Sequence, residues 1–157
     1  MTRIFLFTFL LVATQATAQT LTGRVIKVAD GDTFTLLTAD KEQIRIRLHG
    51  IDAPEKAQPF SHVSRQFLND KVYGKNIEVQ KMDVEQYGRT IGMVFIDSVN
   101  VNEALLQAGL AWHYKKYDKN PDWAKMEEVA KRNRVGLWVE DDAVAPWEWR
   151  KAQRAGR

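Results

Sequence analysis

Four acidic residues lie in two short turns of the sequence, and their spacing suits the binding of a hard metal ion. Asp30 and Asp32 are separated by one glycine, and Asp52 and Glu55 by two residues. Calcium binds carboxylate, carbonyl and water oxygens, so two carboxylates from separate turns would hold the ion and leave positions for water. Each turn alone also has a purely structural explanation, because Asp-Gly is a favoured hairpin dipeptide and Asp and Pro are common turn residues.

Two arginines, Arg47 and Arg89, are candidates for binding an anion. A guanidinium is planar, always charged and able to bind two phosphate oxygens at once, whereas a lysine ammonium is a point charge. A single arginine on a strand is usually a solvated surface residue. Arg47, however, lies five positions before Asp52 and shares a strand-to-turn unit with Glu55. One short segment therefore offers an anion-binding group, a metal carboxylate and a candidate base.

The hydrophobic pattern predicts an α+β protein with five strands and about three packed helices. Ala29-Asp30-Gly31-Asp32 is expected to join the first two strands as a hairpin turn. Five strands in the first two thirds of the chain favour a small closed β-barrel, and the oligonucleotide-binding type is the commonest match at this size. The strands are predicted over 22–28, 33–37, 43–49, 77–82 and 90–96, and the helices over 61–73, over 102–107 and from Asn120-Pro121 to just before Gly136.

The third predicted strand has an apolar and a basic face. Strict alternation turns the apolar face to the core and leaves the basic face for an anion or for solvent. The first predicted helix should likewise present one apolar stripe to the barrel. The apolar strand face is Ile44, Ile46 and Leu48, the basic face is Arg45, Arg47 and His49, and the helix stripe is Val63, Phe67, Leu68 and Val72.

Composition limits the possible classes of protein. The chain has 157 residues, no cysteine and a formal charge of +3. One compact domain fits this length. The lack of cysteine excludes a disulfide scaffold, a cysteine zinc site and a thiol nucleophile.

Residues 1–18 are predicted to be a secretory signal peptide. A short basic start precedes the apolar run from Ile4 to Ala13, and Ala16-Thr17-Ala18 forms a small-x-small cleavage site. The apolar run is too short to span a bilayer, and a buried N-terminal strand is the alternative. We expect cleavage after Ala18 and a secreted or periplasmic, soluble monomer without stable membrane association.

Several segments resemble, in order, the signature of the staphylococcal nuclease-like, or thermonuclease, family. Each motif alone is weak, whereas four in register are specific, and together they span about residues 21–140. The resemblance divides the chain into the signal peptide 1–18, a nuclease-like domain 19–145 and a basic tail 146–157. The matching segments are Asp30–Thr33, Ile46–Glu55, Asp83 with Tyr87-Gly88-Arg89, Val101–Leu105 and Gly109–Ala111, and Trp147–Arg150 resembles the tail of the secreted bacterial branch.

The resemblance implies a Ca²⁺-dependent phosphodiesterase of DNA and RNA that leaves 3′-phosphate products. In the family pattern Arg47 and Arg89 bind the scissile phosphate, and Glu55 holds or deprotonates the attacking water. The implied calcium ligands are the side chains of Asp32 and Asp52 and the backbone carbonyl of Ala53.

Aromatic residues of the second half are candidates for stacking on a nucleobase. By resemblance, Tyr87, Tyr114 and Tyr117 are the candidate substrate-binding residues, and packing at the rim of the barrel is the alternative. His49 would tune substrate contacts from the side of Arg47, although the spacing of the three histidines favours surface or packing roles. In the tail, the two tryptophans are expected to dock on the body, and Lys151 to Arg157 are expected to be frayed.

Two other functions remain open at this point. A non-catalytic barrel that binds single-stranded nucleic acid is the main alternative. Such a degenerate copy is expected to lose part of the active-site set, whereas this chain keeps all of it. A metal phosphoesterase with a small substrate is the second alternative. The complete set is Asp32, Arg47, Asp52, Glu55 and Arg89.

Overall fold

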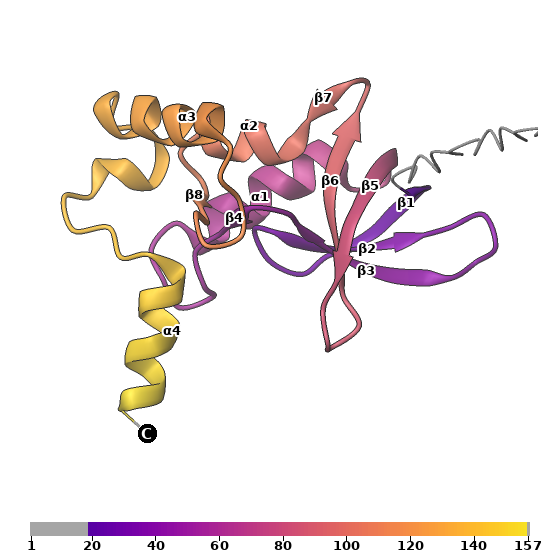
Figure 1. Ribbon diagram of the computed structural model, residues 1–157, viewed down its shortest axis with the longest axis horizontal. Helices are drawn as coiled ribbons and strands as arrows, with labels where there is room; N and C mark the ends of the chain where they lie inside the picture. The colour runs from indigo at the N-terminus through magenta and orange to yellow at the C-terminus, as the bar shows by residue number, and fades with distance from the viewer. Residues whose placement is uncertain (1–18, 157) are drawn as a thin grey trace, which may run out of the picture.

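Five long strands of the computed structural model close into a barrel (Figure 1). The structure describes residues 19–156, so the predicted signal peptide lies outside the described residues. The strands are β1 (Thr20–Val28), β2 (Thr33–Leu37), β3 (Gln43–Leu48), β5 (Asn76–Val84) and β6 (Thr90–Ile96). Their order is β3-β2-β1-β5-β6, and β3 also pairs with β6. The predicted five-stranded barrel is confirmed.

The pairing that closes the barrel also brings the two candidate arginines together. Neighbouring strands are antiparallel, whereas β3 and β6 run parallel, with Ile46 opposite Thr90 and Arg47 opposite Ile91. Arg89 directly precedes Thr90, so it enters β6 beside the strand that carries Arg47.

Short strands outside the barrel position the second acidic turn. β4 (Ile51–Asp52) pairs with β8 (Trp112–His113), with Asp52 opposite Trp112. β7 (Val99–Asn100) adds a short strand beside β6. Two-residue strands are too short to show an alternating pattern, so the sequence did not indicate them.

The three predicted helices are confirmed, and a fourth forms in the tail. α4 (Pro146–Ala155) has a proline and Glu148 in its first turn and Arg154 in its last turn, all of which favour a helix. The sequence predicted a frayed chain from Lys151, but residues 151–155 belong to this helix, so the prediction is wrong for them. α4 lacked a core-forming pattern because only Pro146 in it is buried. The helices are α1 (Ser61–Val72), α2 (Val101–Gln107), α3 (Pro121–Arg132), the short 3₁₀-helix η1 (Gly136–Val139) and α4 (Pro146–Ala155).

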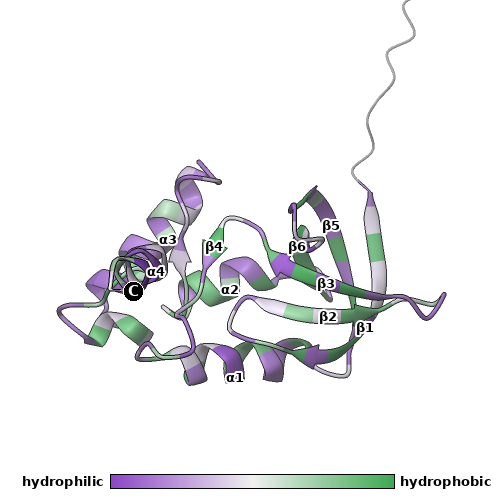
Figure 2. Ribbon diagram, turned by 90° about the horizontal axis from the view of Figure 1, so that it is seen from below, coloured by the Kyte–Doolittle hydropathy of each residue, from purple (hydrophilic) through white to green (hydrophobic). Residues whose placement is uncertain are grey.

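The core fills the barrel and the space under α1 and α2. Hydrophobic and hydrophilic bands alternate along the strands in Figure 2. As predicted for β3, Ile46 and Leu48 are buried and Ile44 is partly buried. Across residues 19–156, no helix is long and apolar enough to span a bilayer.

One predicted core position of α1 is wrong, and the difference matters for the site. Val63 is 49% exposed, while the neighbouring Ser64 is fully buried. The turn before β2 packs directly on this serine, because a Cβ at Gly31 would collide with Oγ of Ser64 and with the Cβ of Ala53. Small residues on both sides therefore let the first acidic turn approach α1 and the second acidic turn.

Candidate active site

An open cavity of about 1230 Å³ is lined by the candidate catalytic and metal-binding residues that the sequence indicated. It lies where the first acidic turn, the end of β3 and the turn before β6 meet the C-terminal helix. The predicted tyrosines Tyr114 and Tyr117 also line it. Its charged lining includes Asp32, Arg47, Asp52, Glu55, Arg89 and Arg150.

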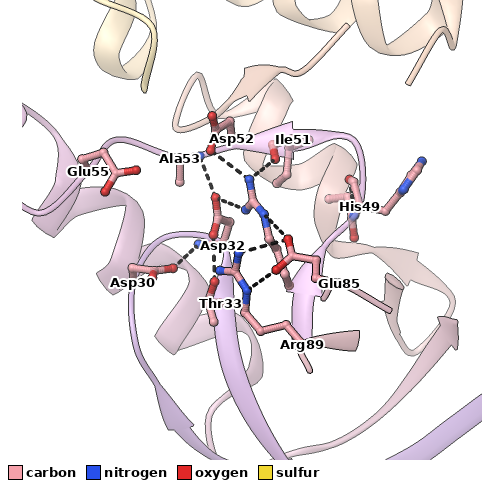
Figure 3. A network of polar contacts seen from close by, with 12 residues as sticks. Asp30, Asp32, Thr33, His49, Ile51, Asp52, Ala53, Glu55, Glu85 and Arg89 are labelled. Carbon is pink, nitrogen blue, oxygen red and sulfur yellow. Dashed lines mark hydrogen bonds and ion pairs between the residues drawn. The ribbon is translucent and has the colours of Figure 1, made fainter. Parts of the chain in front are cut away.

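Arg47 joins the two acidic turns at the centre of this cavity (Figure 3). Its Nη1 lies 2.6 Å from Oδ2 of Asp32, and its Nη2 lies 2.9 Å from Oδ1 of Asp52. Both carboxylates are buried, with relative exposures of 6% and 1%. The same guanidinium donates to the carbonyl of Ile51 at 3.4 Å. Two carboxylates from separate turns therefore contact the same guanidinium group.

Asp32 is also fixed by hydrogen bonds from both turns. The backbone amide of Ala53 donates to its Oδ2 at 2.9 Å, and the hydroxyl of Thr33 donates to its Oδ1 at 2.9 Å. Its own amide donates to Oδ1 of Asp30 at 3.1 Å. These bonds fix the Asp32 carboxylate against the backbone of the second acidic turn at Ala53.

Burial and neighbouring charges set the protonation of the acidic residues. Burial raises the pKa of Asp52, and burial together with the charge of Asp32 raises the pKa of Asp30 to about 6. Burial also opposes ionisation of Asp32, but the charge of Arg47 and the amide of Ala53 outweigh it and lower the pKa of Asp32. Asp32 is thus the firmly ionised member of the cluster.

Arg89 is held beside Arg47 by an acidic residue that the sequence did not single out. Glu85 accepts from Nε of Arg89 at 2.6 Å and from Nη2 at 3.0 Å, and it lies 3.8 Å from Nε of Arg47. The backbone amide of Glu85 donates to the carbonyl of Arg89 at 2.9 Å, which closes the turn between β5 and β6. Glu85 thus orients both arginines toward the cavity.

Arg150 of α4 is a second residue that the sequence analysis missed. Its Nη1 donates to Oε1 of Glu55 at 2.6 Å, and its Nη2 donates to Oδ2 of Asp52 at 2.7 Å. The only sequence signal was the tail motif that contains it, because nothing in the local pattern shows that residue 150 returns to residues 52–55. Trp147 docks α4 as predicted, since its ring stacks on Tyr114 with centroids 4.8 Å apart.

The three candidate substrate-binding tyrosines do not lie together. Tyr114 and Tyr117 form an edge-to-face pair at the cavity wall, with centroids 4.8 Å apart and planes at 85°. Tyr87 lies in the turn between β5 and β6, is 82% exposed and is not part of the cavity lining. Stacking on a nucleobase remains a prediction for all three.

His49 lines the same cavity but is held away from the carboxylate cluster. Its Nε2 lies 3.4 Å from Oδ2 of Asp118, whose Oδ1 lies 2.8 Å from Nε2 of His113. Burial disfavours the charged form of Asp118, but the amide of Asn120 and His113 outweigh it and lower its pKa. A role for His49 in substrate contacts remains a prediction.

The donor set suits a hard divalent cation. Within residues 19–156, no three His, Asp or Glu side chains form a metal-binding group by themselves. Asp32 and Asp52, however, both lie within 2.9 Å of the same guanidinium, so one positive charge already stands between them. Two carboxylates, a carbonyl and water are the oxygen ligands that calcium accepts. The implied ligands Asp32, Asp52 and Ala53 therefore fit such an ion.

A closed oligonucleotide-binding barrel with paired carboxylates and arginines at one end defines a staphylococcal nuclease-like class of protein. The family described as staphylococcal nuclease homologue matches residues 45–140. The chain belongs to this family.

Relatives of similar length support this membership. Over 133 residues the chain is 38% identical to an "Uncharacterized endonuclease" of Haemophilus influenzae, covering 85% of this chain and 75% of the relative. Over 144 residues it is 38% identical to a "Micrococcal nuclease" of Shigella flexneri, covering 84% and 82%. Over 153 residues it is 39% identical to "Protein ParB" of Escherichia coli, covering 90% and 85%.

Proposed function

We propose that this chain is a calcium-dependent nuclease that hydrolyses phosphodiester bonds of DNA and RNA. Membership of a nuclease family supports hydrolysis of nucleic acid. The observation that carries the proposal is the convergence of the buried Asp32 and Asp52 on Arg47 in an open cavity. Arg89 and Glu55 line the same cavity, so the residues proposed to bind the cation, to bind the phosphate and to act as a base share one cavity.

The chain's own residues address the charge problem of phosphodiester hydrolysis. Attack by water builds negative charge on oxygens that already repel a nucleophile. Arg47 and Arg89 offer guanidinium groups that bind phosphate oxygens in pairs. Calcium held by Asp32, Asp52 and the carbonyl of Ala53 would add positive charge beside the same oxygens. Fixed charges of this kind cost no reorganisation when the reaction occurs.

Glu55 is the residue that would handle the proton. Its carboxylate lies at the cavity wall and is 39% exposed, so a water molecule can reach it. Water oxygen attacks phosphorus while its proton passes to Glu55, and the bond from phosphorus to the 5′ oxygen breaks. The leaving 5′ oxygen takes a proton from solvent water, which gives a 5′-hydroxyl and a 3′-phosphate. The alternative role for Glu55 is to orient the attacking water without accepting its proton.

Release of acid-soluble nucleotides tests this proposal directly. Residues 19–157 are incubated with DNA or RNA in calcium, and with EGTA in a parallel reaction. We expect calcium-dependent release from both substrates, abolished by the chelator, and fragments with 3′-phosphate ends. Release that continues unchanged in EGTA would show that the cation assignment is wrong.

The same experiment separates the two alternative functions. A nucleic-acid-binding barrel would retain a labelled single-stranded oligonucleotide and release no fragments. A phosphoesterase of small substrates would cleave a chromogenic aryl phosphodiester and leave DNA and RNA intact. The complete set of five active-site residues favours cleavage over the non-catalytic barrel. The release assay distinguishes nucleic acid from a small substrate.

We also propose that the protein is exported after removal of residues 1–18. The basic start, the apolar run and Ala16-Thr17-Ala18 support this proposal. The full-length chain is expressed in a bacterial host and recovered from the periplasm and the medium. Mass spectrometry should find a mature chain that begins at Gln19, and retention of the intact chain in the cytoplasm would contradict export.

A further inference from the structure

Arg150 reaches from the C-terminal helix into the candidate active site and contacts two of its carboxylates. Its Nη2 donates to Oδ2 of Asp52 at 2.7 Å, and its Nη1 lies 3.2 Å from Oδ1 of the same residue. The same Nη1 donates to Oε1 of Glu55 at 2.6 Å. One guanidinium thus covers both oxygens of Asp52 and one oxygen of Glu55.

Arg150 and Arg47 both bind the carboxylate of Asp52, and both contact its Oδ1. Arg47 donates to Oδ1 of Asp52 at 2.9 Å and is itself a phosphate-binding group in the proposed function. Both arginines line the same cavity and share the same buried carboxylate. A cation that binds Asp52 therefore competes with both guanidinium groups for the same oxygens.

The helix that carries Arg150 is held in place independently of these carboxylates. Trp147 stacks on Tyr114 with ring planes at 8°, and it meets the edge of Trp112 at 5.7 Å. The side-chain amide of Gln58 donates to the carbonyl of Val144, just before α4, at 2.9 Å. The Arg150 side chain is 36% exposed, so it can exchange partners while α4 stays docked.

We propose that Arg150 is a third phosphate-binding arginine of the nuclease site, held by Asp52 and Glu55 until a divalent cation takes those oxygens. The inference rests on the proposed function. Once a cation neutralises Asp52, the guanidinium of Arg150 loses its partner, and the phosphodiester of the substrate is the next anion within the same cavity. A guanidinium is well suited to this exchange because it binds carboxylate and phosphate with the same two-point geometry.

The formal charges of the residues in direct contact favour a third arginine. Five acidic residues face two arginines other than Arg150, so Arg150 and a doubly charged cation together would bring this network to zero. Lys27, Lys56 and Arg65 of the same lining add positive charge, and Asp83 adds one negative charge. The acidic members of the contact network are Asp30, Asp32, Asp52, Glu55 and Glu85, and the two arginines are Arg47 and Arg89.

Two measurements on Arg150→Ala test the inference, and they should move in opposite directions. Calorimetric titration without nucleic acid should show calcium binding about fivefold tighter, because a competing, partly exposed ion pair is gone. At saturating calcium, kcat/KM on single-stranded DNA should fall by about tenfold, the effect of losing about 1.4 kcal/mol of transition-state binding. Arg150→Lys should fall between the two proteins because its ammonium is a point charge.

Arg154→Ala is the matched control. Arg154 lies one turn later on α4, is exposed, and donates from Nε to the backbone carbonyl of Arg150 at 3.3 Å. Arg154→Ala removes one positive charge from the same helix but none of the contacts to Asp52 or Glu55. It should therefore leave calcium affinity and kcat/KM near the wild-type values. Arg150→Gln keeps most of the side-chain length and serves if Arg150→Ala loses its folded circular dichroism spectrum.

Each outcome decides one part of the inference. Tighter calcium binding together with lower kcat/KM supports it. Unchanged calcium affinity overturns the competition, and unchanged or higher kcat/KM at saturating calcium overturns the phosphate role. Wild-type protein that cleaves no nucleic acid overturns the proposed function, whereas active wild type with an equally active Arg150→Ala overturns this inference alone.

Discussion

Arg47 lies between two buried carboxylates that reach it from different turns, so its planar shape matters as much as its charge. Its Nη1 and Nη2 each contact a different aspartate. A lysine at this position would keep the charge but would lack the two nitrogens, held apart in one rigid plane, that contact the two aspartates. The same argument applies to Arg89, which uses Nε and Nη2 to bind Glu85.

We therefore expect Arg47→Lys and Arg89→Lys to fold but to lose most nuclease activity. Losing one aligned cationic donor at such a site lowers the rate by about 10² to 10³. Initial rates of DNA hydrolysis in saturating calcium provide the measurement, and near-ultraviolet circular dichroism checks the fold. Arg45→Lys is the control, because Arg45 is exposed on the same strand. A folded Arg47→Lys protein with full activity would overturn the assignment.

Asp118 leads to a prediction about stability and pH. Its folded pKa is lowered, because the amide of Asn120 and His113 outweigh burial. A lowered carboxyl pKa stabilises the fold above the unfolded value of about 3.9, and this contribution is lost as the pH falls through the folded pKa. The difference in unfolding free energy between wild type and Asp118→Asn should therefore be at its maximum at pH 5 and smaller at pH 3.

Urea titrations at the two pH values measure this difference. The Nε2 atoms of His49 and His113 both face Asp118, at 3.4 Å and 2.8 Å, so both contacts weaken when the carboxylate is protonated. Asp40→Asn, at an exposed acidic residue in the turn between β2 and β3, is the control. An equal difference at pH 5 and pH 3 would show that Asp118 does not stabilise the fold through its charge.

At the scale of elements, packing between turns and helices forms the site. The first acidic turn sits on α1 because Gly31 has no side chain, and a Cβ there would collide with Ser64 and Ala53. Gly31→Ala should therefore destabilise the protein by about 1–3 kcal/mol, the range for overpacking, and weaken calcium binding. Thermal unfolding and calorimetry are the measurements.

Gly156→Ala is the control for this prediction, because a Cβ at Gly156 would meet its nearest neighbour at 3.7 Å, an ordinary contact. It should leave both the unfolding temperature and the calcium affinity unchanged. If Gly31→Ala were as stable as wild type and bound calcium equally well, the close packing of the turn on α1 would not be needed.

The elements also show which features a sequence can reveal. The five long strands were predictable because alternation over five or more residues gives a clear signal. The two-residue strands β4 and β8 have no such pattern, and α4 buries too few residues to show one. The meeting of Asp32 with Ala53, 21 residues apart, followed from the family pattern, whereas the contact of Arg150 with Asp52, 98 residues apart, had no local signature.

At the scale of the whole molecule, a small net charge hides a strongly charged site. The chain carries only +3 overall, yet one cavity holds several carboxylates and three arginines in mutual contact. In the proposed function, such a site would attract both a cation and a polyanion, because a bound cation would neutralise the carboxylates and leave arginine charge for phosphate. The charge of the chain therefore says little about its substrate, whereas the local arrangement is informative.

The cation should also stabilise the whole fold, because its ligands join the turn before β2 to the segment after β3. A ligand that binds only the folded protein adds about 2.7 kcal/mol at a concentration 100 times its Kd. For a domain of this size, we expect calcium to raise the unfolding temperature by about 5–10 °C relative to EGTA. Differential scanning calorimetry measures the shift.

Asp52→Asn should abolish most of this calcium-dependent shift, whatever the variant's own unfolding temperature, because it removes one of the two carboxylate ligands. Asp118→Asn should keep the shift, since Asp118 pairs with histidines outside the cation site. Equal unfolding temperatures in calcium and EGTA for the wild type would contradict a calcium site that links the two turns. A shift that survives in Asp52→Asn would instead place the ion elsewhere on the molecule.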